Sequence, residues 1–197
     1  MKQSDCRGRL KNEYERIKEN HLQALRRTAA RVVLGASVVR VFRPGTKQDM
    51  LNVLERTDIE GLRRLTSQRQ FTKWFETELR LLAAAIRRKN RDNARINPGY
   101  KWGHATKILT LYVRDLVLSS RYFSDGQARR MSGWLCSPID SVVIKRLRKL
   151  GVRLPFASIK QIDTRQKYYA VQDMLNDAAA RVGVPRVWFD DNWGDRQ

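Results

Sequence analysis

Two short segments hold residue types that could carry out covalent chemistry together. Residues 103–107 (GHATK) open one apolar run, and residues 138–141 (PIDS) open another. The amine of Lys107, once neutral, is a nucleophile that can attack a sugar C1′ or form a Schiff base. Asp140 could accept a proton from that amine, or stabilise an oxocarbenium-like sugar as its base departs. We therefore predict Lys107 as a nucleophile and Asp140 as its carboxylate partner.

Each of these residues also has a simpler interpretation. An Asp followed by Ser before an apolar run is typical of a helix N-cap, which would give Asp140 a purely structural role. A Lys in the first turn of a helix is typical of a solvated surface, which would do the same for Lys107. The case for chemistry depends on the two residues acting as a pair.

The segment before Lys107 is also predicted to hold a phosphate group. A glycine at position 103 lets the backbone approach another group closely. The free N–H groups at a helix start attract an anion. We expect a tight turn in which four consecutive residues contact DNA: Gly103, His104, Ala105 and Thr106.

The charge of the chain indicates the substrate class. Lys and Arg number 40 against 20 Asp and Glu, which gives a formal net charge of +20. This excess predicts salt-dependent binding to nucleic acid, although a solvated basic surface is the simpler alternative. We expect a basic strip of phosphate-binding residues that leads to the turn and continues beyond Asp140: Arg87, Arg88, Lys89, Arg91, Lys101 and Lys145.

The two cysteines, Cys6 and Cys136, are too few for a four-cysteine cluster or zinc knuckle. The two histidines add no metal-binding spacing, so we expect no metal and no other cofactor. The first 16 residues lack the apolar core of a signal peptide, and no stretch approaches a transmembrane span. We therefore expect a cytoplasmic protein with no membrane partner.

The elements that must position Lys107 and Asp140 are predicted to be helices. Apolar residues recur at three- and four-residue spacings, and period-two alternation is scarce. The fold class is therefore all-α, with residues 1–197 in a single domain. A loop is expected through residues 125–130, and residues 155–165 are mixed. The predicted helices cover 10–42 (as one or two helices), 50–55, 72–88, 106–119, 142–150 and 164–182, with a short one capped by residues 57–60.

Around the two motifs, over residues 97–150, the chain resembles the helix-hairpin-helix DNA glycosylases that carry a Gly/Pro-Asp motif. In that family a glycine-rich turn precedes a Lys and an apolar helix, and a Pro-x-Asp segment starts a later helix. The matching residues here are the turn 102–106, Lys107, and Asp140 behind Pro138. Ala105 stands where the family usually has a second glycine, and Val142 replaces a common His.

This resemblance implies two packed helical subdomains with a cleft between them, the N- and C-terminal helices completing the second one. It also implies that Lys107 is the nucleophile and Asp140 the carboxylate. The interval of 33 positions between them is similar to that in the archaeal 8-oxoguanine glycosylase branch. A bacterial phage-defence glycosylase that removes glucosylated hydroxymethylcytosine is another relative the chain could resemble.

The family's activity implies a monomer that binds double-stranded DNA and flips a damaged or modified base into a pocket. We expect base-stacking or wedge residues at Trp102, Trp134 and Tyr122. Base removal would leave an abasic site, and lyase cleavage of the strand could follow. A non-catalytic helix-hairpin-helix DNA-binding protein is the alternative. A helical ribonuclease of the toxin type is disfavoured, because neither His21 nor His104 lies beside an Arg in one helix.

Overall fold

The computed structural model describes residues 3–120, 122–149, 151–152 and 154–189, and within these ranges it contains helices and no strand. The predicted all-α class is therefore confirmed. The α-helices are α1 (Gln3–Val33), α2 (Ala36–Val39), α3 (Thr46–Leu54), α4 (Ile59–Arg64), α5 (Gln68–Asn90), α6 (Thr106–Arg114), α7 (Asp125–Ser132), α8 (Ser141–Lys149) and α9 (Arg165–Arg181). Two π-helical segments, η1 (Tyr100–Ala105) and η2 (Asp115–Ser119), flank α6, and a 3-10 turn, η3 (Ile159–Gln161), precedes α9.

Side-chain caps fix where several helices begin. Asp58, Ser67 and Thr164 each accept a hydrogen bond from a backbone N–H in the first turn of α4, α5 and α9. Such caps satisfy donors that have no partner within the helix. The prediction of a loop through residues 125–130 is wrong, because these residues form α7. Its signal was present in the sequence, since Ser124 and Gln127 form a capping box.

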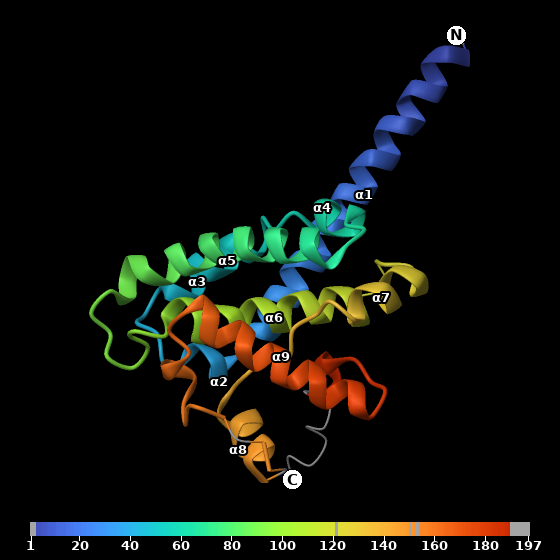
Figure 1. Cartoon of the computed structure of the whole chain (residues 1–197). Coiled ribbons are helices and arrows are strands. Elements are labelled where there is room, and N and C mark those ends of the chain that lie inside the picture. The colour runs from blue at the N-terminus through green and yellow to red at the C-terminus, as the bar shows by residue number, and fades with distance from the viewer. Residues whose placement is uncertain (1–2, 121, 150, 153, 190–197) are drawn as a thin grey trace.

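Helix α6 crosses the middle of the molecule, beneath α5 in Figure 1. Its Ile108, Leu109 and Val113 side chains are buried, and the hydroxyl of buried Tyr112 donates to the Leu54 carbonyl at 2.7 Å. Apolar side chains of α3, α5 and α9 belong to the same continuous core cluster. Burial of this face accounts for the apolar character of α6, and it holds the Lys107 end of α6 in place.

The first half of α1 projects from this core (Figure 1). Leu10 and Tyr14 are exposed there, whereas Leu22, Ala30 and Val33 in the second half are buried. The packing of α1 on the rest of the molecule therefore begins near Leu22. Across the described residues, no helix combines the length and the apolar character needed to cross a membrane.

Candidate functional site

Lys107 and Asp140 form an ion pair, although 33 positions separate them in the chain. The Lys107 Nζ lies 2.9 Å from Asp140 Oδ2. The side chains are 23% and 15% exposed, respectively, so both are largely shielded from solvent but still accessible. The expected pairing of these two residues is thus present in the structure.

Asp140 is also the first residue before α8. Its Oδ1 accepts hydrogen bonds from the backbone N–H groups of Val142 at 2.8 Å and Val143 at 3.0 Å. Its other oxygen, Oδ2, is the one that faces Lys107. Asp140 therefore both caps α8 and pairs with Lys107, because its two oxygens have separate partners.

Two buried side chains that the sequence analysis missed hold the segment before Asp140. The Gln172 amide of α9 accepts from the Ser137 N–H at 2.9 Å and donates to the Ser137 carbonyl at 2.8 Å. The Arg186 guanidinium donates to the carbonyls of Leu135 at 3.0 Å and Trp134 at 3.1 Å. These bonds replace the water contacts that a buried loop backbone loses. No local motif marks Gln172 or Arg186, since their partners lie far away in the chain.

Lys107 is positioned by a longer helix than expected. The π-helical turn η1 runs directly into α6, so the helical stretch begins at Tyr100. The backbone N–H groups of Gly103 and His104 both donate to the Gly99 carbonyl, at 2.9 and 3.0 Å. The prediction of a tight turn with free N–H groups at residues 103–106 is therefore wrong. The connection between α5 and this helix lies earlier, at residues 91–99.

Close packing explains why position 103 is a glycine. A methyl group at Gly103 would overlap the carbonyl oxygen of Ile159 in η3, so this glycine permits a contact within the protein. Ala105 and Thr106 are also buried, and the Thr106 hydroxyl donates to the Trp102 carbonyl. These three residues pack inside the molecule and present no surface to a phosphate.

The Lys107–Asp140 pair lines a cavity of about 150 Å³. Its walls come from four places in the chain: residues 37–42 around α2, the η1–α6 junction, the start of α8, and η3. Phe42 and Ile108 give it an apolar side, and exposed Arg40 adds a cation. Residues 37–42 were not predicted to belong to the site, because the sequence there shows only the end of a helix.

His104 lines the same cavity and has a defined tautomer. Its Nδ1 lies 3.2 Å from the Gly99 carbonyl oxygen, and a carbonyl can only accept, so Nδ1 carries the hydrogen. Burial lowers the pKa of His104, and the nearby charges of Lys160 and Lys107 lower it further, against the opposing effect of the Gly99 hydrogen bond. A neutral ring leaves Nε2 as a hydrogen-bond acceptor.

None of the three aromatic residues expected as wedge or stacking groups lines this cavity. Trp102 is buried, with its ring centroid 6.0 Å from that of Tyr168. Trp134 packs near Phe71 at 6.4 Å, and the Tyr122 hydroxyl donates to Glu60. All three are therefore engaged in internal packing elsewhere, and Phe42 is the aromatic side chain at the cavity.

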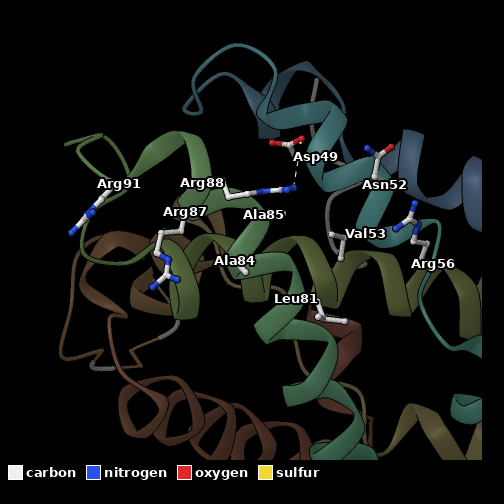
Figure 2. A pocket seen from close by; sticks show the side chains of 10 residues that line it. All are labelled: Asp49, Asn52, Val53, Arg56, Leu81, Ala84, Ala85, Arg87, Arg88 and Arg91. Atoms are coloured by element: carbon white, nitrogen blue, oxygen red, sulfur yellow. Dashed lines mark ion pairs between the residues drawn. The ribbon is translucent and has the colours of Figure 1, made fainter.

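The predicted basic strip is divided between separate places. Arg87, Arg88 and Arg91 border a groove between α3 and α5, here called the α3–α5 groove (Figure 2), and Lys89 pairs with Asp49 beside it. Lys101 is half-buried, with its ammonium 5.0 Å from the Trp102 ring centroid. Lys145 is exposed on α8. The α3–α5 groove and the Lys107 cavity share no lining residue.

Within the described residues, no group of three or more His, Cys, Asp or Glu side chains could hold a metal ion. Comparison with protein-family models, curated proteins and solved structures finds no match to this chain.

Proposed function

We propose that this protein is a DNA glycosylase that removes a damaged or modified base through Lys107 and Asp140. The observation that carries the proposal is the 2.9 Å contact between Lys107 Nζ and Asp140 Oδ2 at the wall of a cavity. Two residues chosen for complementary chemistry, from distant parts of the chain, meet at hydrogen-bond distance. A Lys and a carboxylate in direct contact have the arrangement that an amine nucleophile and its proton acceptor require.

In the proposed reaction, Lys107 acts as the nucleophile and Asp140 as the proton acceptor. The Lys107 ammonium transfers a proton to Asp140, and the resulting amine attacks C1′ of the deoxyribose. The bond from Nζ to C1′ forms as the bond from C1′ to the base breaks. The electron pair leaves with the base, which takes up the proton held by Asp140 and so restores the carboxylate. Ring opening of the sugar would give a Schiff base, from which strand cleavage could follow. No step requires a metal.

The surroundings of the pair suit a nucleotide that has left the duplex. Phe42 and Ile108 offer an apolar wall to a base, and the neutral His104 ring offers an acceptor. Arg40 supplies a cation that suits the phosphate of the same nucleotide. The net charge of +20 favours DNA as the polyanion. Gly103–Thr106 have no part in phosphate binding in this proposal.

The all-helical architecture supports the glycosylase-like fold with two subdomains and a cleft, which is part of the same proposal. Two substrate classes fit it equally. An oxidised purine would imply DNA repair, and a modified phage cytosine would imply antiviral defence. We propose a monomer acting on double-stranded DNA.

The test is abasic-site formation on duplexes that each carry one modified base: 8-oxoguanine, uracil, an alkylated purine, hydroxymethylcytosine or its glucosylated form. Lys107→Gln should abolish excision while DNA affinity stays within a few-fold. Lys167→Gln is the matched control, because Lys167 also pairs with an aspartate, Asp163 at 2.8 Å, outside the cavity. It should excise normally.

Asp140→Asn tests the second residue. Asparagine caps a helix about as well as aspartate, so α8 should stay formed while excision slows by orders of magnitude. Near-normal excision by Asp140→Asn would reduce Asp140 to a cap, and normal excision by Lys107→Gln would exclude Lys107 as nucleophile. Wild-type protein that binds every duplex and excises nothing would favour the non-catalytic DNA-binding alternative.

A further inference from the structure

The α3–α5 groove is a second cationic site, separate from the Lys107 cavity. It has a volume of about 940 Å³ and lies between two helices of the N-terminal half. Figure 2 shows Arg87 and Arg91 at one end of the groove and Arg56 at the other, with Leu81 between them. Four arginines and one aspartate line it, so the groove carries a local excess of positive charge.

Most of this positive charge is available to a ligand. In the described part of the chain, Arg88 is the one lining arginine with an ion pair, to Asp49 at 3.7 Å. Lys89 approaches the same carboxylate at 3.4 Å, so two cations neutralise the single anion of the groove. Arg56, Arg87 and Arg91 make no ion pair with any described residue.

The shape and chemistry of the groove suit a repeating anion. Arg91, the residue directly after α5, lies ten positions beyond Leu81, which corresponds to about 15 Å at 1.5 Å per residue. One strand of B-DNA carries a phosphate about every 3.4 Å along the axis, so roughly four phosphates pass such a length. Arginine guanidinium groups match phosphate oxygens in a bidentate geometry.

The groove also has apolar lining residues. Leu81, which is 54% exposed, lines it together with Val53 and Ala84. A nucleic-acid strand alternates charged phosphates with deoxyribose rings, whose carbon faces can pack on such aliphatic groups. An acidic peptide would need a particular sequence to repeat its charge over the same length. The continuous charge therefore favours nucleic acid over a protein partner.

We infer that the α3–α5 groove binds the sugar-phosphate backbone of DNA away from the base that reacts, without reading its sequence. This inference rests on the proposed function only in taking DNA as the polyanion. It adds a second point of attachment, built from arginines at the C-terminal end of α5 and from Arg56, two residues after the end of α3. Asp49 limits the strength of this site, because it holds Arg88 and Lys89.

The test measures the affinity of the full chain for an unmodified 20-base-pair duplex over a range of salt concentrations. Each phosphate contact contributes about −0.9 to the slope of log association constant against log salt for duplex DNA. The double substitution Arg87→Gln with Arg91→Gln should therefore make the slope shallower by about 1.8. Asp49→Asn should act in the opposite direction and tighten binding, since it frees two cations.

The matched control is Arg69→Gln with Lys73→Gln, which removes two exposed cations at the same spacing from the same helix, outside the groove. It should leave the slope near that of wild type. Equal losses from both double variants would mean a diffuse charge effect and would overturn the inference. A second result would also overturn the inference. In it, the Arg87 and Arg91 substitutions leave the salt slope for DNA unchanged but abolish binding of a poly-glutamate peptide, which would make the groove a protein-binding site. Because the duplex carries no modified base, a failure of base excision cannot produce either result.

Discussion

Each oxygen of the Asp140 carboxylate has its own partner, and this division explains how one residue can serve structure and chemistry. Oδ1 caps α8 through Val142 and Val143, while Oδ2 contacts Lys107. The cap fixes the rotation of the carboxylate, so Oδ2 is held toward the amine before any substrate binds. Such preorganisation avoids the cost of orienting the acceptor during the reaction.

His104 provides a prediction about pH. Burial lowers its pKa below the ordinary value of 6.5. As the pH falls below that value, His104 takes up a proton in the unfolded chain before it does so in the folded protein, so the free energy of unfolding decreases. The stability that comes from keeping His104 neutral is fully present above pH 6.5. It is lost on acidification, by at most about 1.4 kcal/mol per pH unit.

His104→Gln should therefore show a smaller loss of stability between pH 7 and pH 5 than wild type, as measured by urea unfolding. His21→Gln is the control, because it removes the other histidine of the chain, whose side chain is exposed. If all three proteins lose the same free energy over this range, burial of His104 contributes nothing to acid sensitivity.

At the scale of elements, the junction of η1, α6 and η3 shapes the cavity. Gly103 lets the backbone of η3 approach the helix, and Ile159 of η3 is part of the cavity wall. The same glycine that the sequence analysis assigned to DNA binding thus sets the distance between two walls of the site. Its neighbour Gly99 makes an equally close approach to Lys160.

Gly103→Ala should lower the free energy of unfolding by about 1–3 kcal/mol, because the added methyl group forces η3 outward. Excision should also fall, since Ile159 moves with η3. Gly126→Ala is the matched control: Gly126 lies in α7, and a methyl group there meets nothing within 4 Å. It should be neutral or stabilising by up to about 1 kcal/mol. Equal stability of the two variants would show that η3 yields without cost.

At the scale of the whole molecule, a single hydrophobic core holds the parts of the site together, and the first half of α1 projects from this core. Gln172 and Arg186 tie the C-terminal part of the chain to the segment before Asp140, and α6 ties Lys107 to α3 through Tyr112. The position of the Lys107–Asp140 pair therefore depends on contacts from most of the chain. In the projecting half of α1, the large apolar side chains that the structure describes, Leu10, Tyr14 and Ile17, are exposed.

Deleting residues 1–16 should change the free energy of unfolding by less than about 0.5 kcal/mol, because Leu10 and Tyr14 are exposed. Helical circular dichroism should decrease, since a stretch of helix is lost. Leu22→Ala, in contrast, should cost about 2–5 kcal/mol, because Leu22 is buried. A large loss of stability on deletion would show that the first half of α1 packs against the molecule in solution.

The sequence by itself determined the helical class and the approximate positions of most helices, and it singled out the two residues that form the pair. These properties depend on local signals: apolar periodicity, caps such as Asp58 and Thr164, and residue types with a defined chemistry. The capping box at Ser124 shows that even the missed helix α7 had a local signal.

Only the tertiary structure decided that Lys107 and Asp140 touch, that Gly103 faces Ile159, and that Phe42 and Arg40 join the site. It also placed Trp102 in the core and separated the basic strip from the cavity. The physical reason is that each of these facts depends on contacts between residues far apart in the chain. A local pattern records the conformation and burial that a residue prefers, but not which distant surface it meets.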